Sequence, residues 1–376
     1  MSVVKVLLTV LGAVFVLATA LPLVRTPYWW VRAFDFPRAQ IAAGAAVTLV
    51  LFGVVNVGVG EPGAAEWALL AALAASVAYQ VWRMLPYTPL ARAQTAEADG
   101  AAGDDGRTIR LVISNVLMQN REGERWLETV RAEDPDVVVA VETDDWWART
   151  AGALKDTHEW AVELPQDDTY GMCVYSRLPL EDVRVRHLVE DEVPSLFMTA
   201  RLRSGRPVRL VFLHPRPPRP DIRQDSTLRD AELVLAAREV AAFDDPVVVA
   251  GDLNDVAWSY TTSLFQRTAD LLDPRVGRGL FATFHADHWW LRYPLDHVFH
   301  SEHLALVEIR RLGHVGSDHF PIVIELALDP AAPAVQEAPD ADEDDLEEGE
   351  EMVEDAAEFK AEETPQERAE RVEEDV

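Results

Sequence analysis

Three stretches near the amino terminus are almost wholly apolar. They cover residues 3–24, 39–59 and 67–85, and each is long enough as a helix to cross a hydrocarbon core of about 30 Å. A cleaved signal peptide is the alternative for the first stretch, because residues 18–20 form a small-residue pattern typical of cleavage sites. The length of that stretch and the two apolar stretches after it favour three transmembrane helices. We therefore expect residues 1–90 to form a membrane anchor.

Positive charge beside these stretches predicts their orientation. The loop between the first two stretches holds three arginines, and the segment that ends the third holds two more. These are Arg25, Arg32, Arg38, Arg83 and Arg92. The opposite side carries Lys5 and an acidic loop. Because Lys and Arg gather on the cytoplasmic side of a membrane, we expect the C-terminal body to lie in the cytoplasm.

The pattern changes after a linker at residues 91–107. Short apolar runs of strand length alternate with stretches of helical periodicity at 122–132 and 226–242. The runs are apolar at nearly every position, which is typical of strands covered on both faces. Residues 108–329 are therefore predicted to form an α/β domain with sheets inside and helices outside. The predicted strands are 109–114, 137–141, 171–175, 208–213 and 247–250.

The last segment, residues 330–376, is rich in Ala, Pro, Glu and Asp. It carries 20 acidic and 3 basic residues, more than half of the net charge of −30. A segment of this composition cannot offset its ordering entropy by burial, so disorder is expected. A short helix at residues 346–359 that forms on a partner is the alternative.

Composition also limits the chemistry. Cys173 is the only cysteine, which excludes an intrachain disulfide and a cysteine-based zinc site. The body is acidic as well as the tail, which argues against tight binding of duplex DNA through Lys and Arg contacts to phosphate. A weaker encounter with nucleic acid remains open.

Polar and ionisable residues follow the ends of the predicted strands. One such residue would usually only begin a loop. Here they recur in seven segments, ISNV, VVVAVE, GMCVYSR, FLHPRPP, VVVAGDLND, PLDHVF and GSDHFPI, within residues 109–326. The candidate site residues are Asn115, Glu142, His214, Asp252, Asn254, Asp296, Asp318 and His319.

In this order the segments resemble the endonuclease/exonuclease/phosphatase superfamily, which has the deoxyribonuclease-I-like fold. The patterns GD-x-N and SDH-x-P are its most specific marks. The resemblance implies a four-layer α/β sandwich, with two packed sheets between outer helices. Similar bodies behind several N-terminal spans occur in bacterial members, which implies an integral protein of the bacterial inner or plasma membrane.

The resemblance also implies a metal site. Glu142 takes the position of the main metal ligand, assisted by Asn115 and Asp318. Oxygen ligands of this kind suit Mg²⁺ or Mn²⁺. The residue before Glu142 departs from the family pattern. Val141 stands there in place of the Gln that often precedes the metal-binding Glu.

The remaining matched residues imply hydrolysis by water. Asp252 takes the position that orients or deprotonates the attacking water, and Asn254 the position that contacts phosphate. We expect both on one face of a strand, since side chains alternate there. His319 is matched to a phosphate-binding histidine oriented by Asp296. His214 is matched to a second histidine that binds phosphate or protonates the leaving oxygen.

Several nearby residues are open to more than one interpretation. Arg216 and Arg219 could meet an anionic substrate or be solvated charges. Trp289 and Trp290 could face substrate or lipid, or pack in the core or within a loop. His297 is expected to be structural, because neighbours on a strand face opposite ways.

The combined prediction is a membrane-anchored, metal-dependent phosphoesterase that hydrolyses a phosphodiester, in nucleic acid or of phospholipid type. The anchor favours a lipid, since it concentrates the enzyme at the bilayer. The alternative is a non-catalytic membrane scaffold that recruits partners through its acidic tail. A scaffold has no need of eight matched polar residues, so the enzyme is preferred. The oligomeric state is not indicated by the sequence.

Overall fold

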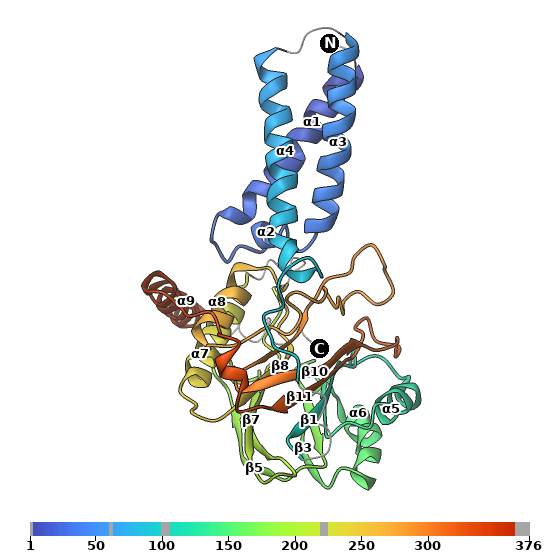
Figure 1. Ribbon diagram of the computed structural model, residues 1–376, viewed down its shortest axis with the longest axis vertical. Helices are drawn as coiled ribbons and strands as arrows, with labels where there is room; N and C mark the ends of the chain where they lie inside the picture. Colours follow the sequence, from blue (N-terminus) through green and yellow to red (C-terminus); the bar gives the residue numbers. More distant parts are fainter. Residues whose placement is uncertain (1–2, 60–62, 99–105, 219–224, 365–376) are drawn as a thin grey trace.

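A helical bundle stands on an α/β body (Figure 1). The computed structural model describes residues 3–59, 63–98, 106–218 and 225–364. The bundle contains the three apolar stretches, and the body contains two β-sheets with helices on their outer faces (Figure 1).

The bundle helices are α1 (Val3–Ala20), α3 (Arg38–Val59) and α4 (Ala64–Met84). With the short turns that extend α1 and α4, all three are long and apolar enough to cross a membrane. They pack closely, since a Cβ placed on Gly44 would lie 2.2 Å from the ring of Phe15. The three predicted helices are therefore present. Their flanking short elements are η1 (Leu21–Leu23), α2 (Trp29–Arg32) and η2 (Leu85–Tyr87).

Two sheets form the centre of the body. The first has the strand order β10-β11-β1-β2-β4-β3, and the second the order β5-β6-β7-β8-β9. The strands of the first are β1 (Thr108–Asn115), β2 (Val137–Val141), β3 (Trp160–Leu164), β4 (Met172–Ser176), β10 (Leu304–Arg311) and β11 (Ile322–Leu328). Those of the second are β5 (Leu180–Arg186), β6 (Ser195–Arg201), β7 (Pro207–Phe212), β8 (Val247–Asp252) and β9 (Asp296–His300).

The layers explain the continuous apolar runs in the sequence. The facing sides of the two sheets share one core, in which Ile113, Val139 and Val248 are fully buried. The opposite sides are covered by helices, so both faces of a central strand are shielded from water. Trp126 packs on the first sheet and Phe265 on the second. The covering helices are α5 (Gly123–Ala132), α6 (Asp145–Ala151), α7 (Thr227–Ala241) and α8 (Tyr260–Thr268). The predicted four-layer α/β sandwich is confirmed.

The loop between the first two bundle helices, residues 21–37, which we call the anchor loop, packs on the body. Arg32 lies in this loop and contacts Asp255, with Nη2 to Oδ2 at 3.0 Å. Trp258 donates its indole N–H to the carbonyl oxygen of Asp35 at 2.7 Å, and the hydroxyl of Tyr87 donates to the carbonyl of Ala257 at 2.6 Å. These groups are buried, so the helical bundle and the body share an interface that excludes water.

The predicted linker also lies against the body where it is described. The Thr95 hydroxyl is 2.9 Å from Nε2 of His300, and both residues are buried. The amide of Ala98 donates to the carbonyl of Leu306 at 2.8 Å. Residues 99–105 of the linker lie outside the described residues.

The tail differs from the expectation of disorder. Residues Glu343–Glu362 form helix α9, which packs on α7 and α8 (Figure 1). Asp342 and Asp345 form a capping box at its start. Asp345 also forms a bidentate ion pair with Arg267, with both distances at 2.6 Å. Basic residues of the body thus neutralise part of the tail's charge, which its own composition could not predict. Residues 365–376 lie outside the described part of the chain.

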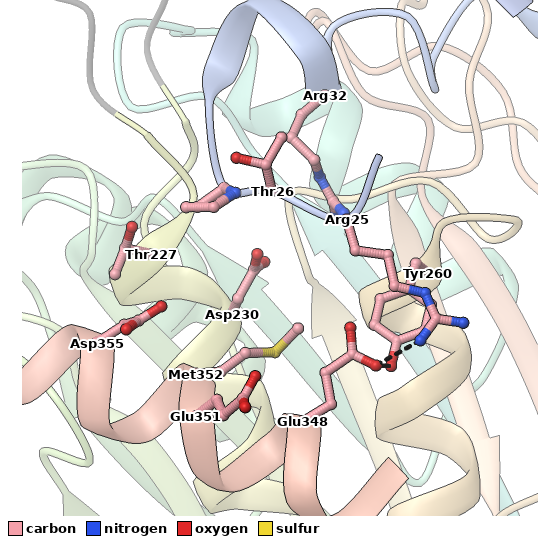
Figure 2. A pocket seen from close by; sticks show the side chains of 11 residues that line it. Arg25, Thr26, Arg32, Thr227, Asp230, Tyr260, Glu348, Glu351, Met352 and Asp355 are labelled. Atoms are coloured by element: carbon pink, nitrogen blue, oxygen red, sulfur yellow. Dashed lines mark hydrogen bonds and ion pairs between the residues drawn. The ribbon is translucent and has the colours of Figure 1, made fainter. Parts of the chain in front are cut away.

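Two close approaches help to hold α9. Gly349 lies against Val234, where a Cβ would come within 3.2 Å of the valine side chain. Ala356 is buried against Leu228 of α7. Figure 2 shows the pocket that remains between α9 and the anchor loop, where Tyr260 and Arg25 contact Glu348. The tail therefore joins the anchor loop to the body.

Removal of residues 342–376 is expected to lower the melting temperature. The deletion exposes Leu228 and leaves Arg267 without its bidentate partner. A loss of about 1–2 kcal/mol corresponds to about 2–8 °C for a body of this size. Thermal unfolding of the detergent-solubilised protein measures it, with a variant ending after residue 364 as the control. Equal melting temperatures for the two variants would show that α9 does not hold the body.

Candidate active site

The eight candidate residues lie at one edge of the two sheets. β1 and β2 run parallel, so Asn115 and Glu142 leave their strands on the same side. β8 and β9 run antiparallel with Asp252 directly opposite Asp296. Strands β1 and β2 pack against β8 across the shared core. The ends of these strands therefore bring together residues that are far apart in the sequence.

Asn115 connects the two sheets. Its Nδ2 donates to Oε1 of Glu142 at 2.6 Å and to Oδ2 of Asp252 at 3.0 Å. Its Oδ1 accepts the amide of Leu117 at 3.0 Å, which fixes the orientation of the side chain. The amide group thus holds two carboxylates from different sheets beside each other.

Glu142 follows β2 in a left-handed conformation, with φ at 61°. The turn after it is tight, since a Cβ on Gly171 would lie 1.9 Å from the carbonyl oxygen of Thr143. Burial raises the pKa of Glu142 to about 7, and the charges of Asp318 and Asp252 add to this effect against the hydrogen bond from Asn115. Several carboxylates therefore share a small volume, which is the electrostatic setting that a cation stabilises.

His319 and Asp296 form a buried pair. Nδ1 of His319 lies 2.7 Å from Oδ2 of Asp296, and its Nε2 lies 3.5 Å from Oδ2 of Asp252. Burial alone would lower the pKa of His319, but the two carboxylates outweigh it and raise the pKa to about 10. The imidazole is therefore held as a cation that can meet a phosphoryl oxygen.

The pKa of His214 is shifted in the opposite direction to that of His319. It is buried beside the ring of Tyr170, and burial with the nearby charge of His319 lowers its pKa to about 4. Its Nδ1 is buried without a hydrogen-bond partner among the described residues. Each of three residues offers one possible ligand atom, and these atoms lie within 4.8 Å of one another. The residues are His214, Glu142 and Asp252. A neutral imidazole thus faces the same space as the carboxylates.

Asp252 ends β8, and its Oδ1 accepts the amide of Asn254 at 2.9 Å. Asn254 lies beyond the strand in a left-handed conformation, with φ at 52°. The expectation that strand alternation puts both side chains on one face is therefore wrong. The Asn254 side chain donates to the carbonyl of Pro215 at 2.9 Å. It connects the turn after β8 to the segment that carries His214.

Residues 113–319 match the model of the Endonuclease/Exonuclease/phosphatase family, and this segment contains all eight candidate residues. The chain belongs to the endonuclease/exonuclease/phosphatase family. It is accordingly a hydrolase that acts on phosphoester bonds. The family fold implies a metal-dependent phosphoesterase or nuclease.

Solved structures with a similar fold come from bacteria and animals. An endonuclease/exonuclease/phosphatase from Beutenbergia cavernae is 20% identical, with 59% of this chain and 72% of that chain covered and a TM-score of 0.47. The human nocturnin catalytic domain is 17% identical, with 59% and 94% covered and a TM-score of 0.48. TDP2 from D. rerio, with single-strand DNA product, is 15% identical, with 58% and 98% covered and a TM-score of 0.47. No curated protein matched the sequence.

The oxygen donors fit the divalent cation that the family implies. Glu142 and Asp252 supply carboxylates on either side of the Asn115 amide, and Asp318 lies close enough to raise the pKa of Glu142. Mg²⁺ and Mn²⁺ prefer such oxygen ligands. Two compact groups of possible ligands occur among the described residues, and Asp318 is in neither; they are Glu142, His214 and Asp252, and Asp252, Asp296 and His319.

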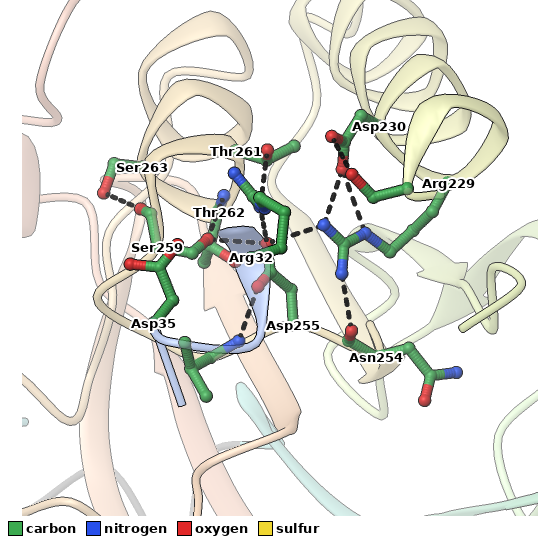
Figure 3. Close-up of polar contacts among 12 residues, drawn as sticks. Arg32, Asp35, Arg229, Asp230, Asn254, Asp255, Ser259, Thr261, Thr262 and Ser263 are labelled. Carbon is green, nitrogen blue, oxygen red and sulfur yellow. Dashed lines mark hydrogen bonds and ion pairs between the residues drawn. The ribbon is translucent and has the colours of Figure 1, made fainter. Parts of the chain in front are cut away.

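A second set of residues supports the turn after β8, and the sequence pattern did not predict it. Arg229 donates to the carbonyl of Asn254 at 2.8 Å and lies 3.3 Å from Asp255 (Figure 3). Asp255 also pairs with Arg32 of the anchor loop (Figure 3). The only signal in the sequence was the acidic residue that ends GDLND. Asp255 thus connects the loop between α1 and α3 to the turn after β8.

Ser317 is a further missed residue. Its hydroxyl donates to the carbonyl of Asn115 at 2.8 Å and accepts the amide of His319 at 3.0 Å. It therefore fixes the histidine relative to β1. Its place in the SDH segment was the available signal.

Two other polar residues near the site form buried contacts within the protein. His297 is buried between Arg275 and the carbonyl of Asp255, at 2.8 and 2.9 Å, as expected. Arg216 is buried in an ion pair with Glu190 at 2.9 Å, so the interpretation as a solvated charge is wrong, whereas a contact with substrate stays a prediction. Arg219 lies outside the described residues.

Proposed function

We propose that the protein is a membrane-anchored hydrolase of phosphodiesters that depends on Mg²⁺ or Mn²⁺. The supporting observation is the hydrogen-bonded set in which Asn115 joins Glu142 to Asp252, beside the buried pair of His319 and Asp296. This set combines clustered carboxylates with a fixed cationic imidazole. It is the combination that phosphoryl transfer by water requires.

Each residue has a role that its surroundings support. Glu142, with Asn115 and Asp318, would hold the cation, which supplies charge neutralisation at the phosphoryl oxygens. Asp252 accepts a proton from the attacking water, and burial raises its pKa to about 6, which suits a base near neutral pH.

The histidines act on the phosphate. His319, held as a cation by Asp296, donates a hydrogen bond to a phosphoryl oxygen. His214 is neutral, so it can donate a hydrogen bond to phosphate from its ring N–H but has no additional proton to give to the leaving oxygen. Asn254 orients the turn through two hydrogen bonds. Its backbone amide donates to the Asp252 carboxylate, and its side chain donates to the carbonyl of Pro215.

A panel of substrates tests this proposal. The purified full chain is assayed with Mg²⁺ or Mn²⁺ on single-stranded and duplex nucleic acid, phospholipid vesicles, phosphoinositides and phosphomonoesters. We expect turnover of at least one phosphodiester that stops on chelation. Absence of metal-dependent turnover across the panel would contradict the proposal and favour the scaffold. The ordered helix α9 already argues against a tail that is free to recruit partners.

Topology provides a separate prediction. The anchor helices end at the body beside Arg25, Arg32 and Arg83, whereas Lys5 lies at the opposite end paired with Glu66. The positive-inside rule then puts the body in the cytoplasm and the N-terminus outside. We expect a C-terminal reporter that works only in the cytoplasm to be active. Activity of an export-dependent reporter at the same position would contradict this orientation.

A further inference from the structure

Two adjacent tryptophans are exposed on a loop next to the active site. Trp289 and Trp290 are 74% and 53% exposed, and Leu291 beside them is also exposed. We call these three residues the aromatic tip. Their exposure excludes the core role that the sequence left open. A contiguous apolar patch of this kind marks a surface that meets protein or membrane.

The tip is carried on a closed stem. Phe284 and Tyr293 pair through their main chains, and the amide of His285 donates to the carbonyl of Leu291 at 2.9 Å. The tip therefore projects from the body at a defined place. In Figure 1 this orange loop projects beside the base of the helical bundle.

The tip lies at the end of the bundle that meets the body. Nε2 of Gln40 donates to the carbonyl of Trp290 at 2.5 Å. Gln40 is in the first turn of α3, one of the helices able to cross a membrane. The stem residue Tyr293 also packs edge-on against Phe36, at 5.7 Å between ring centroids. A bilayer around α3 would begin at the level of the tip.

Other aromatic residues occur at the same level. Tyr28 and Trp30 of the anchor loop and Trp82 in the last turns of α4 are all exposed. Trp and Tyr gather at membrane–water interfaces, where their rings contact both apolar and polar groups. The aromatic tip extends this ring of exposed aromatics from the anchor onto the catalytic body.

The stem also contacts the active site. The amide of Ala286 donates to the carbonyl of Asp318 at 2.6 Å, and the ring of Phe284 lies 5.0 Å from that of His319. The amide of Phe320 donates to the carbonyl of Thr283 at 3.0 Å. The chain that holds the tip therefore also holds the SDH segment.

We propose that the aromatic tip inserts into the headgroup region of the bilayer that the anchor crosses, and that the site at its stem hydrolyses the phosphodiester of a lipid headgroup. The inference rests on the proposed phosphodiesterase function. The acidic body disfavours nucleic acid, and the anchor keeps the site beside a dense array of lipid phosphodiesters. Insertion of two indole rings would orient that site toward the lipid surface.

Site-specific labelling tests insertion without any assay of activity. Cys173 is buried, so a Trp289→Cys variant of the full chain offers one accessible thiol for an environment-sensitive fluorophore. The control is Trp160→Cys, because Trp160 is 40% exposed on β3, at the far end of the body (Figure 1). Both proteins are reconstituted in vesicles of phosphatidylethanolamine and phosphatidylglycerol. We expect spin-labelled phospholipid to quench the label at 289, and aqueous iodide to quench the label at 160. Equal access of iodide to both positions would overturn the insertion.

A double variant tests the substrate class. Trp289→Ser/Trp290→Ser and the control Trp160→Ser are assayed on headgroup release from the same vesicles and on bis(p-nitrophenyl) phosphate in solution. We expect the double variant to lose about tenfold or more of the lipid turnover, since it loses orientation at the surface. Its turnover of the soluble diester should stay within about twofold of wild type.

The two substrates separate the possible failures. Turnover of the soluble diester without any headgroup release by the wild type would overturn the lipid substrate and leave the phosphodiesterase standing. Equal lipid turnover by the double variant and the control would overturn the role of the tip. Absence of turnover of both substrates by the wild type would count against the proposed function itself.

Discussion

Replacement of Glu142 by glutamine is expected to lower phosphodiester turnover by at least about 10²-fold and to leave the fold intact. The substitution keeps the shape of the side chain and removes its charge. Glu142 lies in the turn after β2 and keeps a small exposed fraction, so an amide there does not disrupt the core. Loss of the charge weakens cation binding and the stabilisation that the cation gives to the transition state. Steady-state kinetics over a range of Mn²⁺ concentrations measure the effect, with thermal unfolding as the test of folding.

A matched control comes from the same sheet. Glu163 on β3 is a half-buried glutamate that pairs with Lys155 at 2.6 Å and accepts the hydroxyl of Tyr175, away from the candidate site. Glu163→Gln should retain turnover and metal dependence. Near-wild-type turnover by Glu142→Gln at low metal concentration would remove Glu142 from the metal site.

The second large effect concerns His319 and Asp296 as a coupled pair. His319→Ala should lower turnover by about 10²–10³-fold, the range for loss of a fixed hydrogen-bond donor to the charge that develops in the transition state. Asp296→Asn should cost somewhat less, because Asp252 also lies 3.5 Å from the imidazole and still favours its charged form. The double variant should be little worse than His319→Ala alone, since the carboxylate acts through the histidine.

A double-mutant cycle measured as kcat/KM decides this coupling. Thermal unfolding of all three variants is required, because both side chains are buried. Fully additive losses in folded variants would mean that the two residues act independently. The 2.7 Å contact would then be structural only.

The strands and the position of the site could be predicted because they depend on local pattern. Val137–Val141 is buried at every position, as a continuous apolar run of that length indicates. The motif order also identified Asp252 and Asp296, which the structure places directly opposite each other on β8 and β9. The order of the strands in each sheet could not be predicted, because apolar runs carry no information about which strands are neighbours.

The errors concern partners that are distant in the sequence. Arg32 was interpreted as a topogenic charge, and it is also the buried partner of Asp255, 223 residues away. The interpretation of Arg216 as a solvated charge is wrong, because Glu190 neutralises it in the interior. The tail was predicted to be disordered from its own charge, yet Arg267 of the body pairs with it. The composition of a segment describes that segment alone, whereas its folding also depends on the residues that it contacts elsewhere in the protein.

The central claim is that the clustered carboxylates and histidines form a metal-dependent phosphodiesterase centre. The most direct measurement is hydrolysis of bis(p-nitrophenyl) phosphate by the purified full chain in detergent, before chelation, after chelation, and after return of Mg²⁺ or Mn²⁺. We expect turnover that disappears with chelation, returns with either cation, and is abolished in Asp252→Asn. Turnover that survives complete chelation, or that Asp252→Asn retains in full, would contradict the assignment of this centre.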